Sequence, residues 1–231
     1  MNLKILMRKI YCKLFGQYFF SGKNNKLILV KNGKHIVSTK KIKGLTFDIT
    51  RNNNTIEIHY PTRFRNTCIR IGNDNVYIWL GESPFYELAI KCAYGNSQKL
   101  IIGDGTRIHG GNFILTEYSQ CVVGKNCMFS NLVWIWPSDA HSILDKKTGK
   151  LLNRAKKTLI IGDHCWLAQG VRVTKNARIP NNTIVGSGSG VYKKYTEEYT
   201  IIAGNPAKVI KHNVIWQKDN PYEIECQKNL N

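Results

Sequence analysis

An aliphatic residue recurs at every sixth position through the later part of the chain. The members of this series are Ile161, Leu167, Val173, Ile179, Val185 and Val191. An amphipathic α-helix would place apolar residues three and four apart, and a half-buried strand would alternate them, so this period fits neither. It is typical of the flat sides of a triangular parallel β-solenoid, in which about three sides make one coil and the inward side chains stack into one core. The period therefore predicts an all-β chain with a parallel solenoid fold.

The same period appears earlier in two shorter series. These are Ile102, Ile108 and Ile114, followed by Val123, Phe129 and Ile135. The interval from Ile135 to Ile161 is not a multiple of six, and residues 138–158 within it are polar and rich in lysine. This segment predicts a loop that projects from the solenoid. Long loops in compact domains are often functional, so we expect chemistry at the base of this one.

The chain divides into four parts within a single domain. Residues 1–22 precede the β-rich part, residues 23–99 have a looser pattern, residues 100–205 carry the repeat with loop 138–158, and residues 206–231 form a tail. In residues 23–99, short β-rich pieces alternate with Asn-rich turns. We interpret them as irregular first coils of the same solenoid, with a separate small β domain as the alternative.

Residues 1–22 combine apolar and basic residues at helical spacings. The apolar series is Leu3, Leu6, Met7, Ile10, Leu14 and Tyr18, and the cations between are Lys4, Arg8, Lys9 and Lys13. This pattern predicts an amphipathic basic helix. The cations interrupt the apolar run and no small-residue cleavage site follows, so we expect neither a membrane span nor a signal peptide. Two interpretations stay open: the helix covers the solenoid end or packs between subunits, or it binds an anionic membrane reversibly.

The net charge indicates which partners the protein can bind, and the cysteines indicate the redox state of its compartment. A net charge of +19 attracts polyanions, but the chain has no helix-turn-helix pattern, zinc-finger spacing or aromatic RNA-binding signature, so we expect no nucleic acid partner. The seven cysteines form no CxxC pair and are scattered like core residues. This usage predicts reduced thiols in the cytoplasm and no metal site.

Three segments carry a family resemblance. They read Ile-Ile-Gly-Asp-His-Cys-Trp-Leu-Ala-Gln-Gly at 160–170, Ile-Pro-Asn-Asn-Thr-Ile-Val-Gly-Ser-Gly-Ser at 179–189, and Ile-Ala-Gly-Asn-Pro-Ala-Lys-Val at 202–209. The order and spacing of these motifs resemble the hexapeptide-repeat acyltransferase superfamily. The similarity extends from Ile101 to Ile215 and is greatest to bacterial polysaccharide and sialic acid O-acetyltransferases and to galactoside and maltose acetyltransferases. It implies a left-handed parallel β-helix.

The resemblance also implies a catalytic histidine at the base of the loop, and the matching residue is His141. A sugar hydroxyl needs a base with a pKa near neutrality before it can attack an acetyl thioester, and imidazole meets that need. His164, beside Trp166, is the alternative base. Asp139 is expected to orient the imidazole of His141, a role that a backbone carbonyl could also fill.

Other positions match the oxyanion and acetyl-CoA sites of the family. The backbone N–H of Gln169 would stabilise the oxyanion, although many relatives have a smaller residue there. Trp166 would line the acetyl pocket, or else pack in a corner of the solenoid. Coenzyme A would lie in a groove between neighbouring solenoids. Ala168 and Ser187 would let its pantetheine arm approach, and Lys193, Lys208 and Lys211 would face its phosphates, unless these lysines are simply solvated.

These features together predict an acetyl-CoA-dependent O-acetyltransferase. Its expected acceptor is a bacterial cell-surface sugar, in capsule, lipooligosaccharide or sialic acid, and the basic charge predicts that this acceptor is anionic. The resemblance implies a homotrimer with active sites between subunits. We expect the enzyme in the cytoplasm, with the inner face of the cell membrane as the alternative location. The alternatives are N-acetylation of an amino-sugar nucleotide and a non-catalytic solenoid that binds glycans.

Overall fold

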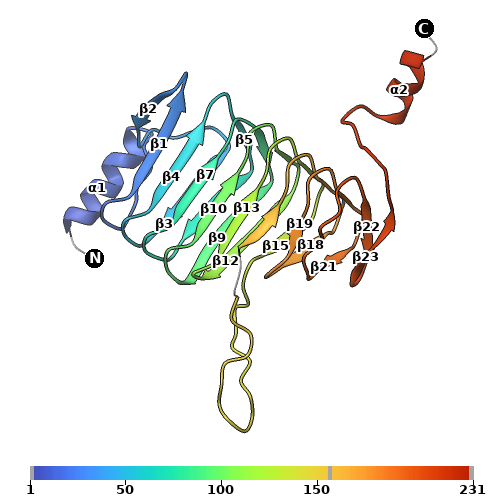
Figure 1. Cartoon of the computed structure of the whole chain (residues 1–231). Coiled ribbons are helices and arrows are strands. Elements are labelled where there is room, and N and C mark those ends of the chain that lie inside the picture. The colour runs from blue at the N-terminus through green and yellow to red at the C-terminus, as the bar shows by residue number, and fades with distance from the viewer. Residues whose placement is uncertain (1–2, 156–157, 229–231) are drawn as a thin grey trace.

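The structure, a computed structural model, describes residues 3–155 and 158–228. Three parallel sheets wrap these residues into a triangular solenoid of about seven coils (Figure 1). From β4 to β21, each coil contributes one strand to sheet 1, then to sheet 2, then to sheet 3. The all-β parallel solenoid predicted from the six-residue period is confirmed.

The strands of each sheet, taken along the solenoid axis, have the following bounds. Sheet 1 contains β2 (Lys34–Val37), β1 (Lys26–Lys31), β4 (Thr55–His59), β7 (Tyr77–Leu80), β10 (Lys99–Ile102), β13 (Gln120–Val123), β16 (Leu159–Ile161) and β19 (Arg178–Ile179). Sheet 2 contains β5 (Arg63–Arg65), β8 (Pro84–Tyr86), β11 (Arg107–Ile108), β14 (Met128–Phe129), β17 (Trp166–Leu167), β20 (Ile184–Val185), β22 (Ile201–Gly204) and β23 (Ala207–Lys211). Sheet 3 contains β3 (Leu45–Ile49), β6 (Thr67–Ile71), β9 (Leu88–Gly95), β12 (Gly111–Glu117), β15 (Val133–Trp136), β18 (Arg172–Thr174) and β21 (Gly190–Val191).

The core is a stack of inward side chains in register from coil to coil. All six members of the long aliphatic series are fully buried. Val123 lies beside Ile161, which lies beside Ile179 in the next coil. Strands between Lys26 and Gly95 extend the same three sheets, so residues 23–99 include coils of the one solenoid.

The series that starts at Ile102 needs one correction. Phe113, rather than Ile114, is fully buried and pairs with Ile135, whereas Ile114 is only half-buried. The side from Ile108 is therefore one residue shorter than the period predicts. A glycine at 111 permits this tighter corner, because a Cβ there would lie 2.9 Å from Cγ2 of Ile108.

Glycines form a column where sheet 1 turns into sheet 2. Gly81, Gly103, Gly124 and Gly162 occupy this position in successive coils. A Cβ on Gly124 would lie 2.6 Å from the backbone carbonyl carbon of Gly162, closer than real Cβ contacts allow. The close stacking of the coils at this corner therefore requires residues without side chains.

The N-terminal helix is shorter than the sequence predicts. Helix α1 spans Leu3–Leu14, and Gly16 after it has a φ of +61°, a conformation that favours glycine and ends the helix. Tyr18 is buried beyond the helix, and its hydroxyl donates to the carbonyl oxygen of Leu45 at 2.8 Å. Of the predicted helix, Met1 and Asn2 lie outside the described residues, as do the side chains of residues 3–5 and Arg8.

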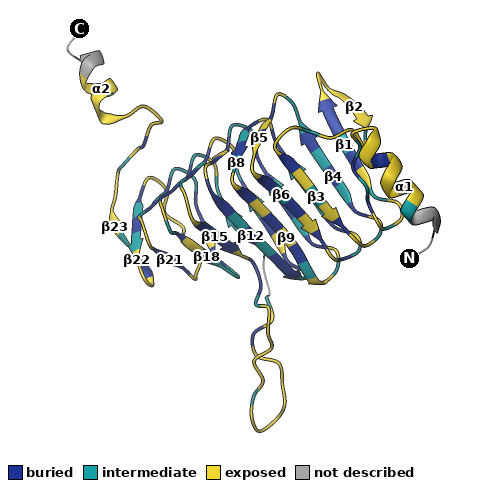
Figure 2. Ribbon diagram, turned by 180° about the vertical axis from the view of Figure 1, so that it is seen from behind, coloured by how far each residue is buried: buried dark blue, intermediate teal, exposed yellow. Residues whose placement is uncertain are grey.

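The predicted loop projects from the solenoid between β15 and β16 (Figures 1 and 2). A single antiparallel bridge joins Leu144 to Leu151 within it, and residues 156–157 of the loop lie outside the described part. The tail after β23 ends in α2 (Pro221–Lys228), beyond which residues 229–231 are also outside it. Neither helix in the described ranges is long and apolar enough to cross a membrane.

Candidate active site

A polar network closes the base of the projecting loop. The Asn153 side-chain amide donates to the Asp139 carboxylate at 2.7 Å and to the backbone oxygen of His141 at 2.8 Å. The Lys175 ammonium, in the next coil, donates to the Asp139 carboxylate and, at 2.9 Å, to the backbone oxygen of Asn153. These bonds join both ends of the loop to the solenoid, so the network fixes where the His141 backbone lies.

His141 lies in this network through its backbone only. Its side chain is exposed, and among the described residues no hydrogen bond to its imidazole is formed. The Asp139 carboxylate bonds to Asn153 and Lys175 instead. The structure thus places Asp139 and His141 at the same loop base but does not join their side chains, and the orienting role of Asp139 stays a prediction.

Removing the Asn153 side chain should impair turnover more than stability. We expect Asn153→Ala to lower kcat on the order of 10- to 100-fold, because small displacements of catalytic groups cost rates of that size. Steady-state kinetics and a thermal melt together measure this. Thr148→Ala is the matched control, since it removes a side-chain bond to Asp145 at the loop tip, away from the base. Equal effects from the two variants would contradict a positioning role for Asn153.

A second group of candidate residues lies at the corner where sheet 2 turns into sheet 3, here called the Trp corner (residues 168–170 and 186–189). The Trp166 indole N–H, just before it, lies 3.4 Å from the Ser130 hydroxyl. Ala168 is buried, and Gln169 and Ser187 are exposed. The N–H of Gly188 donates to the backbone oxygen of Gln169 at 2.8 Å, so Gln169 and Ser187 are neighbours in successive coils.

The Gln169 backbone N–H is available to a ligand. The N–H groups before and after it donate to Val185 and Asn131 in adjacent coils, each at 3.0 Å. The N–H of Gln169 itself forms no hydrogen bond with any other residue in the described ranges. A free donor beside a half-buried tryptophan suits an oxyanion, and this assignment remains a prediction.

The loop leaves the solenoid at a different corner. The loop corner (residues 137–158, 175–177 and 192–194) joins sheet 3 to sheet 1, and it holds His141, Asp139 and Lys193. In the coil that contains Trp166, strand β18 on one side of the triangular solenoid separates the loop corner from the Trp corner. Six extended residues span roughly 20 Å, at about 3.3 Å per residue, so the two groups do not meet within one chain.

The basic residues assigned to coenzyme A are also divided. Lys193 lines a groove of about 780 Å³ on sheet 1 with Arg178 and Lys194. Lys208 and Lys211 are exposed on β23, where Lys208 pairs with Ala203. Ala203 packs against Gly186, so Lys208 is near the Trp corner, whereas Lys211 is at the far end of its strand, opposite Ile201.

The side chain of His164, the alternative base, packs against a tryptophan and lies close to an asparagine side chain. Its ring stacks on Trp216 with centroids 4.5 Å apart, and its Nδ1 is 3.1 Å from the side-chain oxygen of Asn182. The indole N–H of Trp216 donates to the backbone oxygen of His164 at 2.8 Å, and its ring lies 6.2 Å from that of Trp166. Sequence reasoning missed Trp216, which lies after the repeat and carries no periodic signal.

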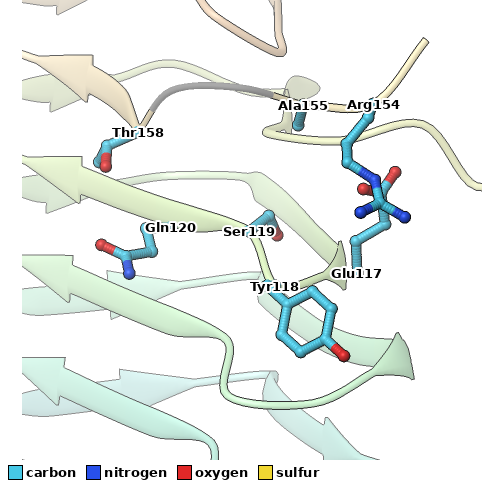
Figure 3. Close-up of a pocket in the computed structure, with 7 residues that line it drawn as sticks. All are labelled: Glu117, Tyr118, Ser119, Gln120, Arg154, Ala155 and Thr158. Carbon is cyan, nitrogen blue, oxygen red and sulfur yellow. The ribbon is translucent and has the colours of Figure 1, made fainter. Parts of the chain in front are cut away.

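A separate pocket lies beside the returning end of the loop (Figure 3). It has a volume of about 210 Å³ and is lined by residues 117–120, Arg154, Ala155 and Thr158. None of the residues assigned from the sequence contributes to it. This pocket is therefore not the predicted acetyl-transfer site.

Two of the buried cysteines, Cys92 and Cys121, do not offer a nucleophile. Burial raises the pKa of the Cys92 thiol to about 12, and it raises the pKa of Cys121 as well. A thiol with such a pKa stays protonated at neutral pH, and the thiolate is the reactive form. Among the residues that the structure describes, no group of three or more His, Cys, Asp or Glu side chains is arranged to hold a metal ion.

Comparisons with known proteins place the chain in a family. The polysialic acid O-acetyltransferase of Neisseria meningitidis is 29% identical over 187 residues, which cover 81% of this chain and 86% of that protein. The polysialic acid O-acetyltransferase of Escherichia coli O1:K1 is 31% identical over 126 residues, 54% of this chain and 40% of that protein. No family model matches the sequence.

The solved structures agree. A polysialic acid O-acetyltransferase structure superimposes with a TM-score of 0.74 and 25% identity, covering 93% of this chain and all of that one (100%). The shared fold therefore includes the early coils and not only the motif-bearing repeat. The chain belongs to the hexapeptide-repeat acyltransferase superfamily and is an O-acetyltransferase.

Proposed function

We propose that the enzyme transfers the acetyl group of acetyl-CoA to a hydroxyl of a bacterial cell-surface sugar, with His141 as general base. The observation that supports this most is the similarity, over most of both chains, to the polysialic acid O-acetyltransferase of Neisseria meningitidis. Because acetyl-CoA is a metabolite of the cytoplasm, the proposal also places the enzyme there. Contact with a membrane is a separate proposal.

The proposed reaction is a direct transfer. The His141 imidazole takes the proton of the sugar hydroxyl as its oxygen attacks the thioester carbonyl carbon. The Gln169 N–H stabilises the negative charge that forms on the carbonyl oxygen. The C–S bond then breaks, and the proton on His141 passes to the departing sulfur. Trp166 lines the pocket for the acetyl group. Lys193, Lys208 and Lys211 offset the negative charges on the phosphates of coenzyme A.

The division of the candidate residues between two corners supports a site shared by two subunits. In a cyclic trimer, the loop corner of one solenoid can face the Trp corner of its neighbour, which brings His141 opposite Gln169. Neither corner is complete alone. We therefore expect a trimer in solution, with about three times the 26.4 kDa mass of the chain, measured by gel filtration with light scattering.

Subunit mixing tests the shared site directly. His141→Ala and Gln169→Pro should each be inactive, but in a mixed trimer an intact loop corner meets an intact Trp corner at one of three sites. Random mixing in equal amounts is expected to restore about one quarter of the native rate, because three quarters of the trimers are mixed. An active monomer, or no recovery in trimers shown to be mixed, would contradict the shared site.

The charge distribution supports an anionic acceptor. A groove of about 520 Å³ on sheet 2 is lined by Arg63, Arg107 and Lys218, with one carboxylate, Glu82, among them. Burial is the main cause that lowers the pKa of Lys218, and the nearby positive charge of Arg107 lowers it further. Such a surface attracts an acidic glycan.

Thiol release from acetyl-CoA, measured against sialic acid, sialic acid polymer, hexosamine and neutral hexose acceptors, tests the proposed function. We expect release that depends on an acidic acceptor and on a hydroxyl group. Release with neutral acceptors alone would remove the anionic acceptor, and release with an amino sugar alone would favour N-acetylation. Failure to bind coenzyme A would contradict the reaction itself.

A further inference from the structure

Helix α1 presents most of the apolar side chains that the structure describes in it to solvent rather than to the core. Met7, Ile10, Tyr11 and Leu14 are 63, 50, 53 and 75% exposed. Among the helix side chains that the structure describes, Cys12 is the one that is buried. In the described part of the helix, Cys12 and the half-buried Leu6 thus face the solenoid, while most of the apolar side chains face away from it.

The exposed apolar residues form one continuous strip. Positions 7, 10, 11 and 14 follow the spacing of a single helix face. Phe15, 62% exposed, extends the strip, since its ring centroid lies 4.4 Å from that of Tyr11. We call these five residues the outward ridge. At the same end of the molecule, Ile36 and Val37 of β2 are 48 and 69% exposed (Figure 1).

Cations flank the outward ridge. Lys9 and Lys13 are exposed and, with Lys41 and one carboxylate, Asp48, line a groove of about 590 Å³ beside β3. Residues 1–47 contain eleven Lys and Arg residues and no Asp or Glu. This segment thus carries more than half of the net charge of +19. An apolar strip between cations, in a segment without carboxylates, complements a surface that is both apolar and anionic.

We propose that the N-terminal end of the solenoid binds the surface of an anionic lipid bilayer through the outward ridge. The helix lies in the interface plane, with the ridge among the acyl chains and the lysines among the headgroups. A second copy of the chain is a poor occupant, because it would bring two such cationic segments together without counter-charge. Lipid phosphates supply that counter-charge.

The proposal does not depend on the acetyl acceptor or on His141. A cyclic oligomer whose symmetry axis runs along the solenoids would add to it, since its copies of the ridge lie at the same end and face one flat surface. Several weak contacts then act together and raise the apparent affinity. The enzyme would in this way be held where membrane-associated acceptors are found.

Co-sedimentation of the full chain with vesicles tests this binding. We expect the native protein to bind vesicles of phosphatidylcholine and phosphatidylglycerol (about 7:3) at low salt, and binding to fall as salt screens the headgroups. The protein should bind vesicles of phosphatidylcholine alone at least about tenfold more weakly, because these vesicles carry no net negative charge to attract the lysines. Ile10→Glu with Leu14→Glu should lower the partition coefficient at least about tenfold, since it places charge in the ridge.

The matched control is Ile210→Glu with Ile215→Glu, which changes the same residue type at positions 64 and 69% exposed, outside the N-terminal segment. This control should bind anionic vesicles like the native protein. Thermal melts and thiol release verify that the ridge variant is folded and active. Equal binding by ridge variant and native protein, or no binding by either, would overturn the proposal. A ridge variant that instead lowers the mass in light scattering would assign the ridge to a contact between copies.

Discussion

Replacing His141 with alanine is expected to lower the rate of acetyl transfer about 10²- to 10⁴-fold, the usual contribution of general base catalysis. The sugar hydroxyl would then lose its proton acceptor at the moment of attack. The fold should not change, because the His141 side chain is exposed and only its backbone oxygen is bonded to Asn153. The measurement is thiol release under saturating acetyl-CoA, with a circular dichroism melt of the same sample.

Two further histidine variants make this result specific. His35→Ala removes an exposed imidazole from β2 and should leave the rate unchanged. His164→Asn is preferable to alanine, because His164 has a φ of +52° and asparagine tolerates that conformation. This variant loses the stacking on Trp216, so we expect a lower melting temperature and a smaller loss of rate. Activity that survives His141→Ala but not His164→Asn would make His164 the base.

Replacing Phe129 with alanine is expected to destabilise the fold by about 3 to 5 kcal/mol. Phe129 is fully buried on β14, between Ile108 of the preceding coil and Leu167 of the next. Its ring stacks on that of Phe113 with centroids 6.2 Å apart. Alanine leaves a cavity that rigid neighbouring coils cannot close. For a chain of this length the melting temperature should fall by roughly 6 to 20 °C.

Tyr118→Ala is the matched aromatic control, since Tyr118 is 65% exposed. Its effect should stay within about 0.5 kcal/mol, as for most surface substitutions. Both variants must be melted at one protein concentration, because association raises the apparent stability of each. Similar melting temperatures for the two variants would contradict the stacked aromatic core.

The regular part of the solenoid follows from the sequence because each side there has the same length. From Ile161 to Val191, the rule that every sixth residue points inward is sufficient to predict the core, and all six of these residues are buried. At Ile114 the same rule is wrong by one residue, since the corner before Phe113 is shortened at Gly111. A fixed six-residue period predicts solenoid sides of constant length, and it therefore cannot predict a corner that is one residue shorter.

The contacts within the candidate site are harder to predict from the sequence than the solenoid core. His141 and Asp139 were assigned through the family motifs, but the bonds of Asp139 to Asn153 and Lys175 join positions 14 and 36 residues away. The stacking of Trp216 on His164 spans 52 residues. No local pattern specifies these contacts, because they depend on how the loop and the tail return to the coils. Tyr18, which the helical spacing includes in the helix, instead lies beyond Gly16 and forms long-range hydrogen bonds with Ile42 and Leu45.

The solenoid ends in antiparallel strands at two of its sheet edges. At the N-terminal end β2 pairs antiparallel with β1, and at the other end β23 pairs antiparallel with β22. A parallel stack of coils could otherwise add further molecules end to end, as amyloid-like fibrils do. At these edges the strand direction is reversed, so an incoming coil meets the wrong hydrogen-bonding pattern. At these two edges the terminal strands thus disfavour the end-to-end addition of further coils to a molecule that is built like a short fibril.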